Sequence, residues 1–368
     1  MVIGGHMKKC DILLFISIIL ISLIGVVMIY SSSSIWAEYK FNDSFKYLKA
    51  QTIFLLLGYV ILFVVLNIDY KKYFNKANII FGVCFLLLIL VLIPGIGTIR
   101  NGSRSWFGIG SLGIQPSEFM KLGLIIFTSK YLVKNDKEIS NILKGVLPIL
   151  IVIFLVFALI MLQPDFGTGV VITMAIIGLL FISGVKLGFF VKLSLFGLIG
   201  IVVLIIIAPY RMERIISFLN PWTDPLGSGF QIIQSLYAIG PAGLLGLGLG
   251  NSVQKHFYLP EPQTDFIFAV ICEELGFIGA FIVIALFAFI IYRGFKIAIN
   301  CNNLFGKYLA FGITFMLSFQ TILNLSVVVG LIPVTGVTLP FLSYGGSSLL
   351  ISMASMGILL NISKDTNC

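Results

Sequence analysis

The sequence predicts an all-α integral membrane protein with about ten transmembrane helices. Two features of its composition support this prediction: 59% of the 368 residues are hydrophobic and only 11% are charged, whereas a soluble domain carries about 25% charged residues. A third observation is that apolar runs of about 20 residues, the length of a spanning helix, recur along the whole chain. Because no soluble domain of useful size fits between these runs, residues 1–368 are expected to form a single polytopic membrane domain.

The first apolar run follows Lys8 and Lys9 and could be a signal peptide. At about 20 residues it is long for a cleaved segment, so we expect it to remain as the first span. Residues 1–7 are either a tag remnant or an upstream start, and they are not used for the prediction of the fold. The ten expected spans are 12–31, 50–68, 77–95, 117–133, 146–163, 166–184, 189–208, 266–292, 307–331 and 346–362.

The distribution of Lys and Arg predicts that both termini are cytoplasmic. An even number of spans puts both ends on one side, and most of the 24 Lys and Arg residues then fall at the inner ends, as the positive-inside rule requires. The long loop 209–265, between spans seven and eight, is then extracellular. The formal charge of +9 suits a protein surrounded by anionic membrane lipids. Because the basic residues are spread over loops on both sides, nucleic acid is not an expected partner.

The cysteines indicate neither a disulfide framework nor a zinc site. The five cysteines fall inside spans or on the predicted cytoplasmic side, where disulfides are rare. None has the spacing of metal ligands, and His6 and His256 are the only histidines. The cysteines are Cys10, Cys84, Cys272, Cys301 and Cys368.

Four outer segments are richer in Gly, Pro and polar residues than the short, Lys-rich inner loops. The longest of them has internal order: residues 211–219 alternate charged and apolar residues like a short interfacial helix, and residues 228–239 are expected to form a second helix. Long loops with ordering residues are where functional sites are commonly placed, so we expect function at the outer face. The four segments are 96–116, 163–169, 209–265 and 332–346.

Asp265 is the strongest candidate for a catalytic residue. It lies in Leu259-Pro-Glu-Pro-Gln-Thr-Asp-Phe266, at the end of the longest outer loop and at the start of a span. A carboxylate at the membrane boundary is energetically expensive and often functional. Its alternative role is structural, because Thr264 or Asp265 could cap the helix. The functional interpretation is a general base.

A second polar group precedes the fourth span. Pro116 and Ser117 suit a helix start, and Glu118 and Lys121 are i, i+3 neighbours that can form an ion pair. This pair is either structural or part of the cavity that also holds Asp265.

Four outer cations, Arg104, Arg211, Arg214 and Lys255, also have two interpretations. They could bind lipid headgroups and solvent, or they could recognise a diphosphate, for which Arg has suitable geometry.

Three further acidic residues are interpreted as structural. Asp165 lies in the tight corner 163–169, where Pro and Gly supply the backbone angles. Glu273 and Glu274 lie roughly 12 Å below Asp265 along a helix and are expected to face the bundle interior. The glycines of 246–250 do not indicate a dinucleotide loop, because no strand precedes them.

Several long motifs, in register over most of the chain, resemble the shape, elongation, division and sporulation family, which includes RodA, FtsW and SpoVE. The matching stretches are 105–121, 163–169, 218–222, 231–255, 259–276 and 332–348.

The resemblance implies a peptidoglycan glycosyltransferase of the bacterial cytoplasmic membrane. Such enzymes polymerise lipid II, a disaccharide pentapeptide on undecaprenyl diphosphate, outside the membrane, together with a class B penicillin-binding protein. The acidic residue of the family's Thr-Asp-Phe motif maps onto Asp265, and its Glu and Lys at the fourth span map onto Glu118 and Lys121. Glu261 and Ser343, which lie in matching stretches, join the four cations as substrate-binding candidates. At positions 335 and 257 the division branch typically has a Lys and an acidic residue, whereas this chain has Thr335 and Phe257. The sequence does not decide between the elongation, division and sporulation branches.

The implied chemistry converts an α-linked donor into a β-1,4-linked glycan, and inversion requires a single in-line displacement. Asp265 is assigned to accept the proton of the acceptor's 4-hydroxyl group. The departing diphosphate is expected to be stabilised by Arg211, Arg214 and Lys255. A divalent ion, Mg²⁺ or Mn²⁺, could assist them. The alternative function is a lipid II flippase, but a transporter is expected to place its polar groups near the midplane.

Overall fold

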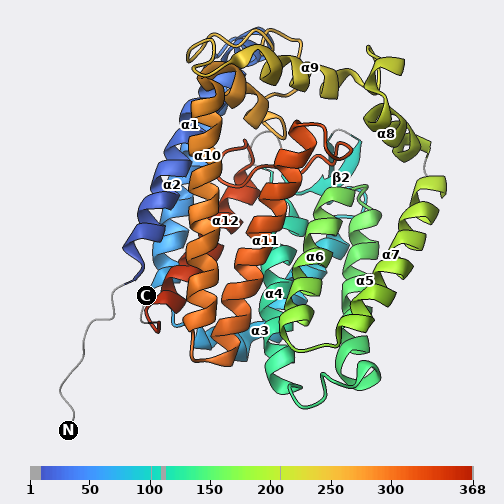
Figure 1. The fold of residues 1–368 in the computed structure, drawn as a ribbon. Helices are drawn as coiled ribbons and strands as arrows, with labels where there is room; N and C mark the ends of the chain where they lie inside the picture. Colours follow the sequence, from blue (N-terminus) through green and yellow to red (C-terminus); the bar gives the residue numbers. More distant parts are fainter. Residues whose placement is uncertain (1–9, 101, 109–112, 208, 367–368) are drawn as a thin grey trace.

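The computed structural model describes residues 10–100, 102–108, 113–207 and 209–366. Its helices form an upright bundle, with two short helices lying across one end (Figure 1). All ten expected spans are helical, as α1 (Ile12–Phe41), α2 (Lys46–Leu66), α3 (Lys71–Leu90), α4 (Pro116–Lys134), α5 (Leu147–Met161), α6 (Phe166–Ile182), α7 (Leu187–Ile207), α10 (Ile267–Asn300), α11 (Leu304–Val328) and α12 (Gly346–Ser363).

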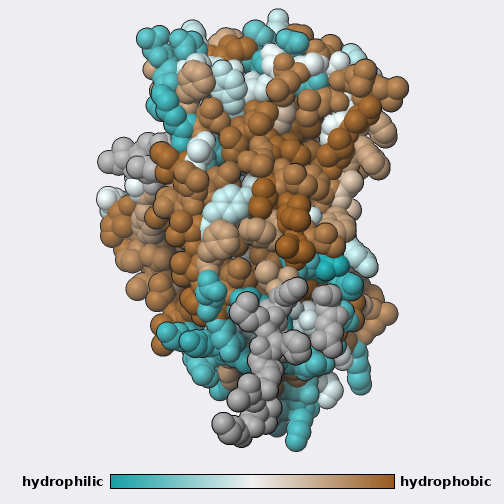
Figure 2. Space-filling view, turned by 90° about the vertical axis from the view of Figure 1, so that its left-hand side faces the viewer, coloured by the Kyte–Doolittle hydropathy of each residue, from teal (hydrophilic) through white to brown (hydrophobic). Residues whose placement is uncertain are grey.

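Within the described part of the chain, eight helical segments are long and apolar enough to cross a membrane. The remaining two of the ten are shorter or more charged: α6 is apolar but has 17 residues, and α4 carries Glu118, Lys121, Lys130 and Lys134. A multi-pass membrane protein is therefore confirmed, while the count of ten spans stays a prediction. The face shown in Figure 2 agrees with this architecture, because a broad hydrophobic belt lies between a hydrophilic lower end and an upper end where hydrophilic and hydrophobic residues are mixed.

The centre of the bundle is built from helices with many small or polar residues. Nearly every residue of α12 is buried, whereas α7 lies at the edge of the bundle. Small side chains allow close backbone approach where the lipid gives no hydrophobic drive for association. An added Cβ at Gly357, for example, would lie 2.8 Å from the carbonyl oxygen of Leu62 on α2.

The end of the bundle that is predicted to be extracellular, called the outer end below, carries most of the irregular structure. Both helices expected in the long loop are present, as α8 (Pro209–Leu219) and α9 (Phe230–Ile239), joined by the 3-10 turn Pro221–Thr223 and followed by the 3-10 turn Gly240–Ala242. A small antiparallel hairpin, β1 (Thr98–Arg100) and β2 (Ser103–Trp106), lies in a segment for which no strands were expected. Period-2 hydrophobic alternation, the usual strand signal, is missing from these short strands.

Three expected spans differ clearly from the helices in the structure. α3 begins six residues before and ends five residues before the expected span 77–95. α1 continues ten residues beyond the expected end at residue 31 and stops at Asn42, which adopts the left-handed conformation (φ 55°) typical of a helix end. α10 is not one continuous helix, because Gly276 has non-helical angles (φ 65°, ψ −162°) that separate residues 267–275 from 277–300. Hydrophobicity alone does not reveal such a break.

Candidate active site

Asp265 is half-buried and directly precedes α10. The N-cap residue of α10 is Phe266, which makes no side-chain capping bond, so neither Thr264 nor Asp265 occupies the capping position. The Thr264 hydroxyl donates to Oδ1 of Asp265 at 3.0 Å. Both roles considered for Asp265, general base and support of the helix start, stay predictions.

Glu118 and Lys121 form a buried ion pair at the outer end of α4. The Lys121 Nζ atom lies 2.8 Å from Oε2 of Glu118, and both side chains are less than a tenth exposed. Lys121 also donates to Oε1 of Gln320 on α11, at 2.9 Å. A buried ion pair gains little net stability over apolar packing, because both charges lose their water. This costly arrangement is consistent with a functional role, which stays a prediction.

Two amides of α11 link this pair to Asp265. The Gln320 Nε2 atom donates to the carbonyl oxygen of Thr338 at 2.9 Å. One turn later, Nδ2 of Asn324 donates to the carbonyl oxygens of Asp265, at 2.8 Å, and Val337, at 2.7 Å. The backbone of Asp265 is thereby fixed to the same helix that contacts Lys121. Sequence reasoning missed both residues, although two amides four residues apart in an apolar span are a usable signal.

Of the ten buried polar side-chain atoms that lack a hydrogen-bond partner among the described residues, one is in Gln263, close to Asp265 in sequence, and one is in Asn324, which bonds to the Asp265 backbone. Among the described residues, Oε1 of Gln263, Oδ1 of Asn324 and Oγ1 of Thr335 are buried without a hydrogen bond. Leaving such an atom unpaired costs about 1–3 kcal/mol, so these atoms are expected to bind water or a polar ligand.

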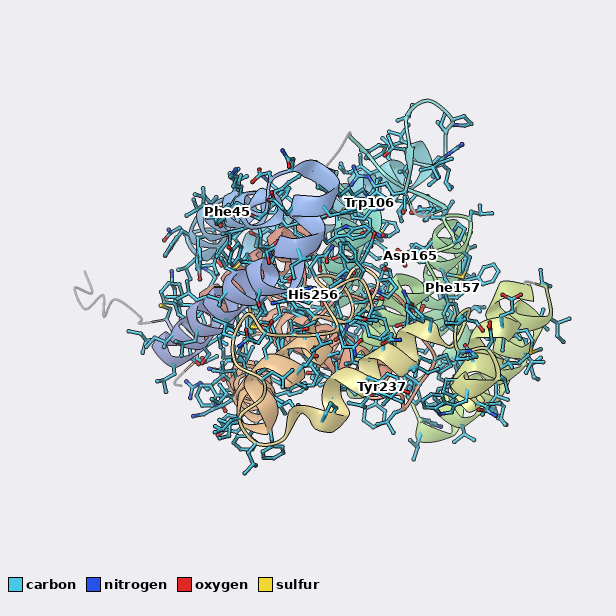
Figure 3. All side chains as sticks on the ribbon, turned by 90° about the horizontal axis from the view of Figure 1, so that it is seen from above. Phe45, Trp106, Phe157, Asp165, Tyr237 and His256 are labelled. Atoms are coloured by element: carbon cyan, nitrogen blue, oxygen red, sulfur yellow. The ribbon has the colours of Figure 1, made fainter. Side chains whose placement is uncertain are left out.

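Asp165 has a second role besides forming the corner before α6. Its Oδ1 atom caps α6 by accepting from the Thr168 N–H group at 3.2 Å. Its Oδ2 atom accepts from Nε2 of Gln115 at 3.0 Å and from Oγ of Ser117 at 3.4 Å, on the chain that starts α4. Burial raises the pKa of Asp165, and the nearby Glu118 raises it further. Seen from above, Asp165 and Trp106 lie on the same side of the outer end (Figure 3).

The predicted substrate-binding cations differ in how far the structure describes their side chains and in their burial. Arg104 is half-buried, and its guanidinium reaches the carbonyl oxygen of Leu92 at 3.5 Å. Arg211 and Arg214 belong to α8, but their side chains lie outside the described residues. Sequence reasoning gave no role to Arg100, which stacks over the Trp106 ring at 4.9 Å.

Lys255 requires a correction. Its side chain is only 3% exposed, and its Nζ atom lies 2.9 Å from Oε1 of Glu274. It also donates to the Ser31 hydroxyl and the Gly250 carbonyl oxygen. Because these groups use the donors of the ammonium, Lys255 is not placed to hold a diphosphate. The sequence could not indicate this, because Glu274 meets Lys255 only through the fold.

The two remaining candidates differ in exposure. Glu261 is exposed and has a positive φ of 44°. Ser343 is buried, and its hydroxyl accepts from the Leu339 N–H group at 2.8 Å. This bond closes a turn, so the geometry favours a structural role for Ser343 over substrate contact.

Comparison with known proteins settles the family. The model of the FtsW/RodA/SpoVE family, described as "Cell cycle protein", matches residues 11–368. This chain is a member of that family.

Relatives of this FtsW/RodA/SpoVE member are similar over nearly their whole length. Stage V sporulation protein E of Bacillus subtilis is 52% identical over 354 residues, which cover 96% of this chain and 97% of that protein. A probable peptidoglycan glycosyltransferase FtsW of Geobacter sp. (strain M18) is 40% identical, with 96% of each chain covered.

Solved structures agree with this assignment. A chain from a study described as "Structural coordination of polymerization and crosslinking by a peptidoglycan synthase complex" has a TM-score of 0.80 and 33% identity, covering 97% of this chain and 98% of the other. RodA of Thermus thermophilus has a TM-score of 0.73 and 29% identity, with 98% of each chain covered.

In this family member, no group of three or more His, Cys, Asp or Glu side chains that could hold a metal occurs among the described residues. A divalent ion would instead be held by one or two carboxylates and substrate oxygens, as Mg²⁺ commonly is. That ion stays a prediction.

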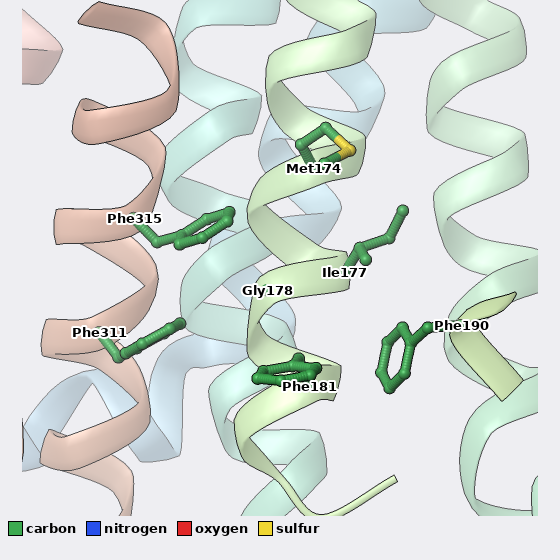
Figure 4. A pocket seen from close by; sticks show the side chains of 7 residues that line it. All are labelled: Met174, Ile177, Gly178, Phe181, Phe190, Phe311 and Phe315. Carbon is green, nitrogen blue, oxygen red and sulfur yellow. The ribbon is translucent and has the colours of Figure 1, made fainter. Parts of the chain in front are cut away.

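An apolar cavity of about 250 Å³ opens on the side of the bundle. It is lined by α6, α7 and α11, and aromatic rings surround it (Figure 4). The lining residues are Met174, Ile177, Gly178, Phe181, Phe190, Phe311 and Phe315. Such a lining suits a hydrocarbon chain.

Proposed function

We propose that this protein is a peptidoglycan glycosyltransferase that polymerises lipid II into β-1,4 glycan strands at the outer face of the cytoplasmic membrane. The observation that carries the proposal is the placement of Asp265: its backbone is bonded to Asn324 of α11, the same helix whose Gln320 contacts Lys121. The names of relatives as peptidoglycan glycosyltransferases support the reaction class.

The proposed reaction is an in-line displacement. Asp265 accepts the proton of the acceptor's 4-hydroxyl group while that oxygen attacks the anomeric carbon of the donor. The bond from that carbon to the diphosphate oxygen breaks, and undecaprenyl diphosphate leaves with the bonding electrons. Outer cations such as Arg104 would stabilise the diphosphate. The apolar cavity beside α7 is a place for an isoprenoid chain.

The decisive experiment uses purified protein and lipid II, with glycan products resolved on a gel. We expect polymer, and we expect more of it when a cognate class B penicillin-binding protein is added, because the solved relative belongs to a peptidoglycan synthase complex. No polymer with any candidate partner, together with lipid II transfer across vesicles, would favour the flippase instead.

The outer face is tested by cysteine labelling. In a variant without native cysteines, Ser228→Cys should react with a membrane-impermeant reagent in intact cells, and Asn302→Cys should not, since both positions are exposed but at opposite ends. Native Cys301 is a poor inner reporter because it is buried. Labelling of Asn302→Cys in intact cells would reverse the orientation.

We place the biological role in sporulation rather than division, because identity to the sporulation relative is 52% against 40% for the FtsW relative. Expression in a Bacillus subtilis strain that lacks the sporulation protein should restore heat-resistant spores. Rescue of an FtsW-depleted strain alone would assign the protein to division.

A further inference from the structure

The break in α10 is filled by the outer loop. In a continuous helix, the carbonyls of Glu273 and Glu274 would accept from the N–H groups four residues later. Here they accept instead from Leu247 and Gly248 in the outer loop, both at 2.9 Å. In return, the freed N–H groups donate to loop carbonyls, Phe277 to Gly243 at 2.9 Å and Ile278 to Leu244 at 3.2 Å. The loop and the helix thus exchange hydrogen-bond partners.

This exchange requires two glycines. Gly246 has a φ of 71° and Gly276 a φ of 65°, a region that other residues adopt only with strain. An added Cβ at Gly246 would collide with the backbone at Glu274, and one at Gly276 would collide with the backbone at Gly246 and Leu244. The two backbones are therefore in direct contact at the break.

Buried side chains reinforce the contact. Glu274 is fully buried, pairs with Lys255 and accepts the Ser31 hydroxyl of α1 at 2.7 Å and 2.6 Å on its two oxygens. Glu273 accepts from the Ser252 hydroxyl and from the N–H group of Val253, the latter at 2.9 Å. Two carboxylates thus hold residues 252–255 against α1 and the first part of α10.

We propose that Glu274, Lys255 and Ser31 are positioning residues for Asp265. The segment 267–275 begins two residues after Asp265, and its connection to 277–300 is interrupted at Gly276. Its orientation therefore depends on the outer loop and α1, through Glu274, together with the bond from Asn324 of α11 to the Asp265 backbone, rather than on the rest of α10. This inference rests on the proposed glycan polymerisation, in which Asp265 is the base.

Matched serines provide the first test. Ser31 and Ser33 are both buried on α1, but the Ser33 hydroxyl bonds only to Ile29 within its own helix. Ser31→Ala should lower kcat for lipid II polymerisation on the order of tenfold, within the ~10²-fold range for a small misplacement of a catalytic group. KM should change less than twofold, since Ser31 is buried and its hydroxyl is bonded to Glu274. Ser33→Ala should leave both constants near wild type.

A comparison of two buried ion pairs, Glu274 with Lys255 and Asp11 with Arg293, provides the second test. Arg293 and Asp11 form a comparably buried pair at the other end, with a distance of 2.6 Å. Glu274→Gln and Arg293→Met should both lower the midpoint of thermal unfolding, but only Glu274→Gln should lower kcat per folded molecule. If Glu274→Gln does not fold, the comparison of the serines decides.

The outcomes separate the two proposals. Wild-type protein that makes no polymer overturns the proposed function and this inference together. Active wild-type protein with equal kcat for Ser31→Ala and Ser33→Ala, or for the Glu274 and Arg293 variants, overturns only the positioning role.

Discussion

The two ends of the bundle bury polar groups for different purposes. At the inner end, Asp11 caps α1 by accepting from the Leu14 N–H group at 3.0 Å, and it also pairs with Arg293 of α10. Asn361 similarly accepts from the Tyr70 N–H group and donates to the Leu66 carbonyl oxygen. These side chains close helix ends and join neighbouring helices. Their presence is explained by the fold alone.

At the outer end, more polar groups are buried than the helix ends require. Glu118 and Lys121 are buried but cap no helix by a side-chain bond, and Gln263 and Asn324 have buried oxygens without a partner among the described residues. The half-buried Asp265 is not the N-cap residue of α10. Buried polar groups that the fold does not need are costly. The difference teaches that polar groups in excess of structural need, rather than polar groups as such, indicate the functional end.

The largest expected effect is at Asp265. Asp265→Asn should lower polymerisation on the order of 10²–10⁴-fold, because the amide keeps the shape but cannot accept a proton. The bond from Asn324 to the backbone oxygen is unaffected by the change. The measurement is the initial rate of polymerisation from lipid II, normalised to folded protein.

Asp11→Asn is the matched control from the inner end. It should lower stability but leave the rate per folded molecule close to wild type. A rate for Asp265→Asn within about threefold of wild type, against the losses typical of a missing base, would remove the catalytic assignment.

A smaller effect is expected at the buried pair of α4. Lys121→Met leaves Glu118 charged and unpaired, which should destabilise the protein by about 3–5 kcal/mol and reduce polymerisation. The double variant Glu118→Gln with Lys121→Met should recover much of the stability, since no uncompensated charge remains. If the pair serves the reaction, polymerisation should stay low in the double variant. Recovery of both stability and polymerisation would make the pair purely structural, like Asp11 and Arg293.

Much of the fold could be predicted from the sequence because hydrophobicity and length are local properties. All ten expected spans are helices, and the two helices of the outer loop are present. The break at Gly276 could not be predicted, since its partner residues 243–248 lie about thirty positions earlier and meet it only in the folded protein.

The same reason explains the errors at the site. The sequence predicted that Lys255 is an outer cation available to the substrate, but in the structure its ammonium is paired with Glu274. Gln320 and Asn324 were overlooked because their partners, the Lys121 side chain and the backbone carbonyls of residues 265, 337 and 338, lie far from them in the sequence or in the backbone, although the spacing of the two amides was a usable signal. By contrast, the pairing of Glu118 with Lys121 follows from helix spacing alone and is present.

The smallest expected effect is at Asp165 and concerns stability alone. It tests whether this carboxylate is required by the fold, like Asp11 at the inner end, or is buried at a cost to stability, like the polar groups of the outer end. Its pKa is raised above the ordinary 3.8, mainly by burial. A raised pKa in the folded state means that Asp165 contributes stability below about pH 3.8, and that this contribution is lost as the pH rises through the folded-state pKa. At pH 7 the charged carboxylate therefore destabilises the folded protein.

Asp165→Asn, which can still accept from the Thr168 N–H group, should raise the midpoint of thermal unfolding at pH 7 by a few degrees. The difference from wild type should shrink towards pH 4, as measured by thermal unfolding across that range. A variant less stable than wild type at pH 7 would instead place Asp165 with Asp11, as a carboxylate that the fold itself requires.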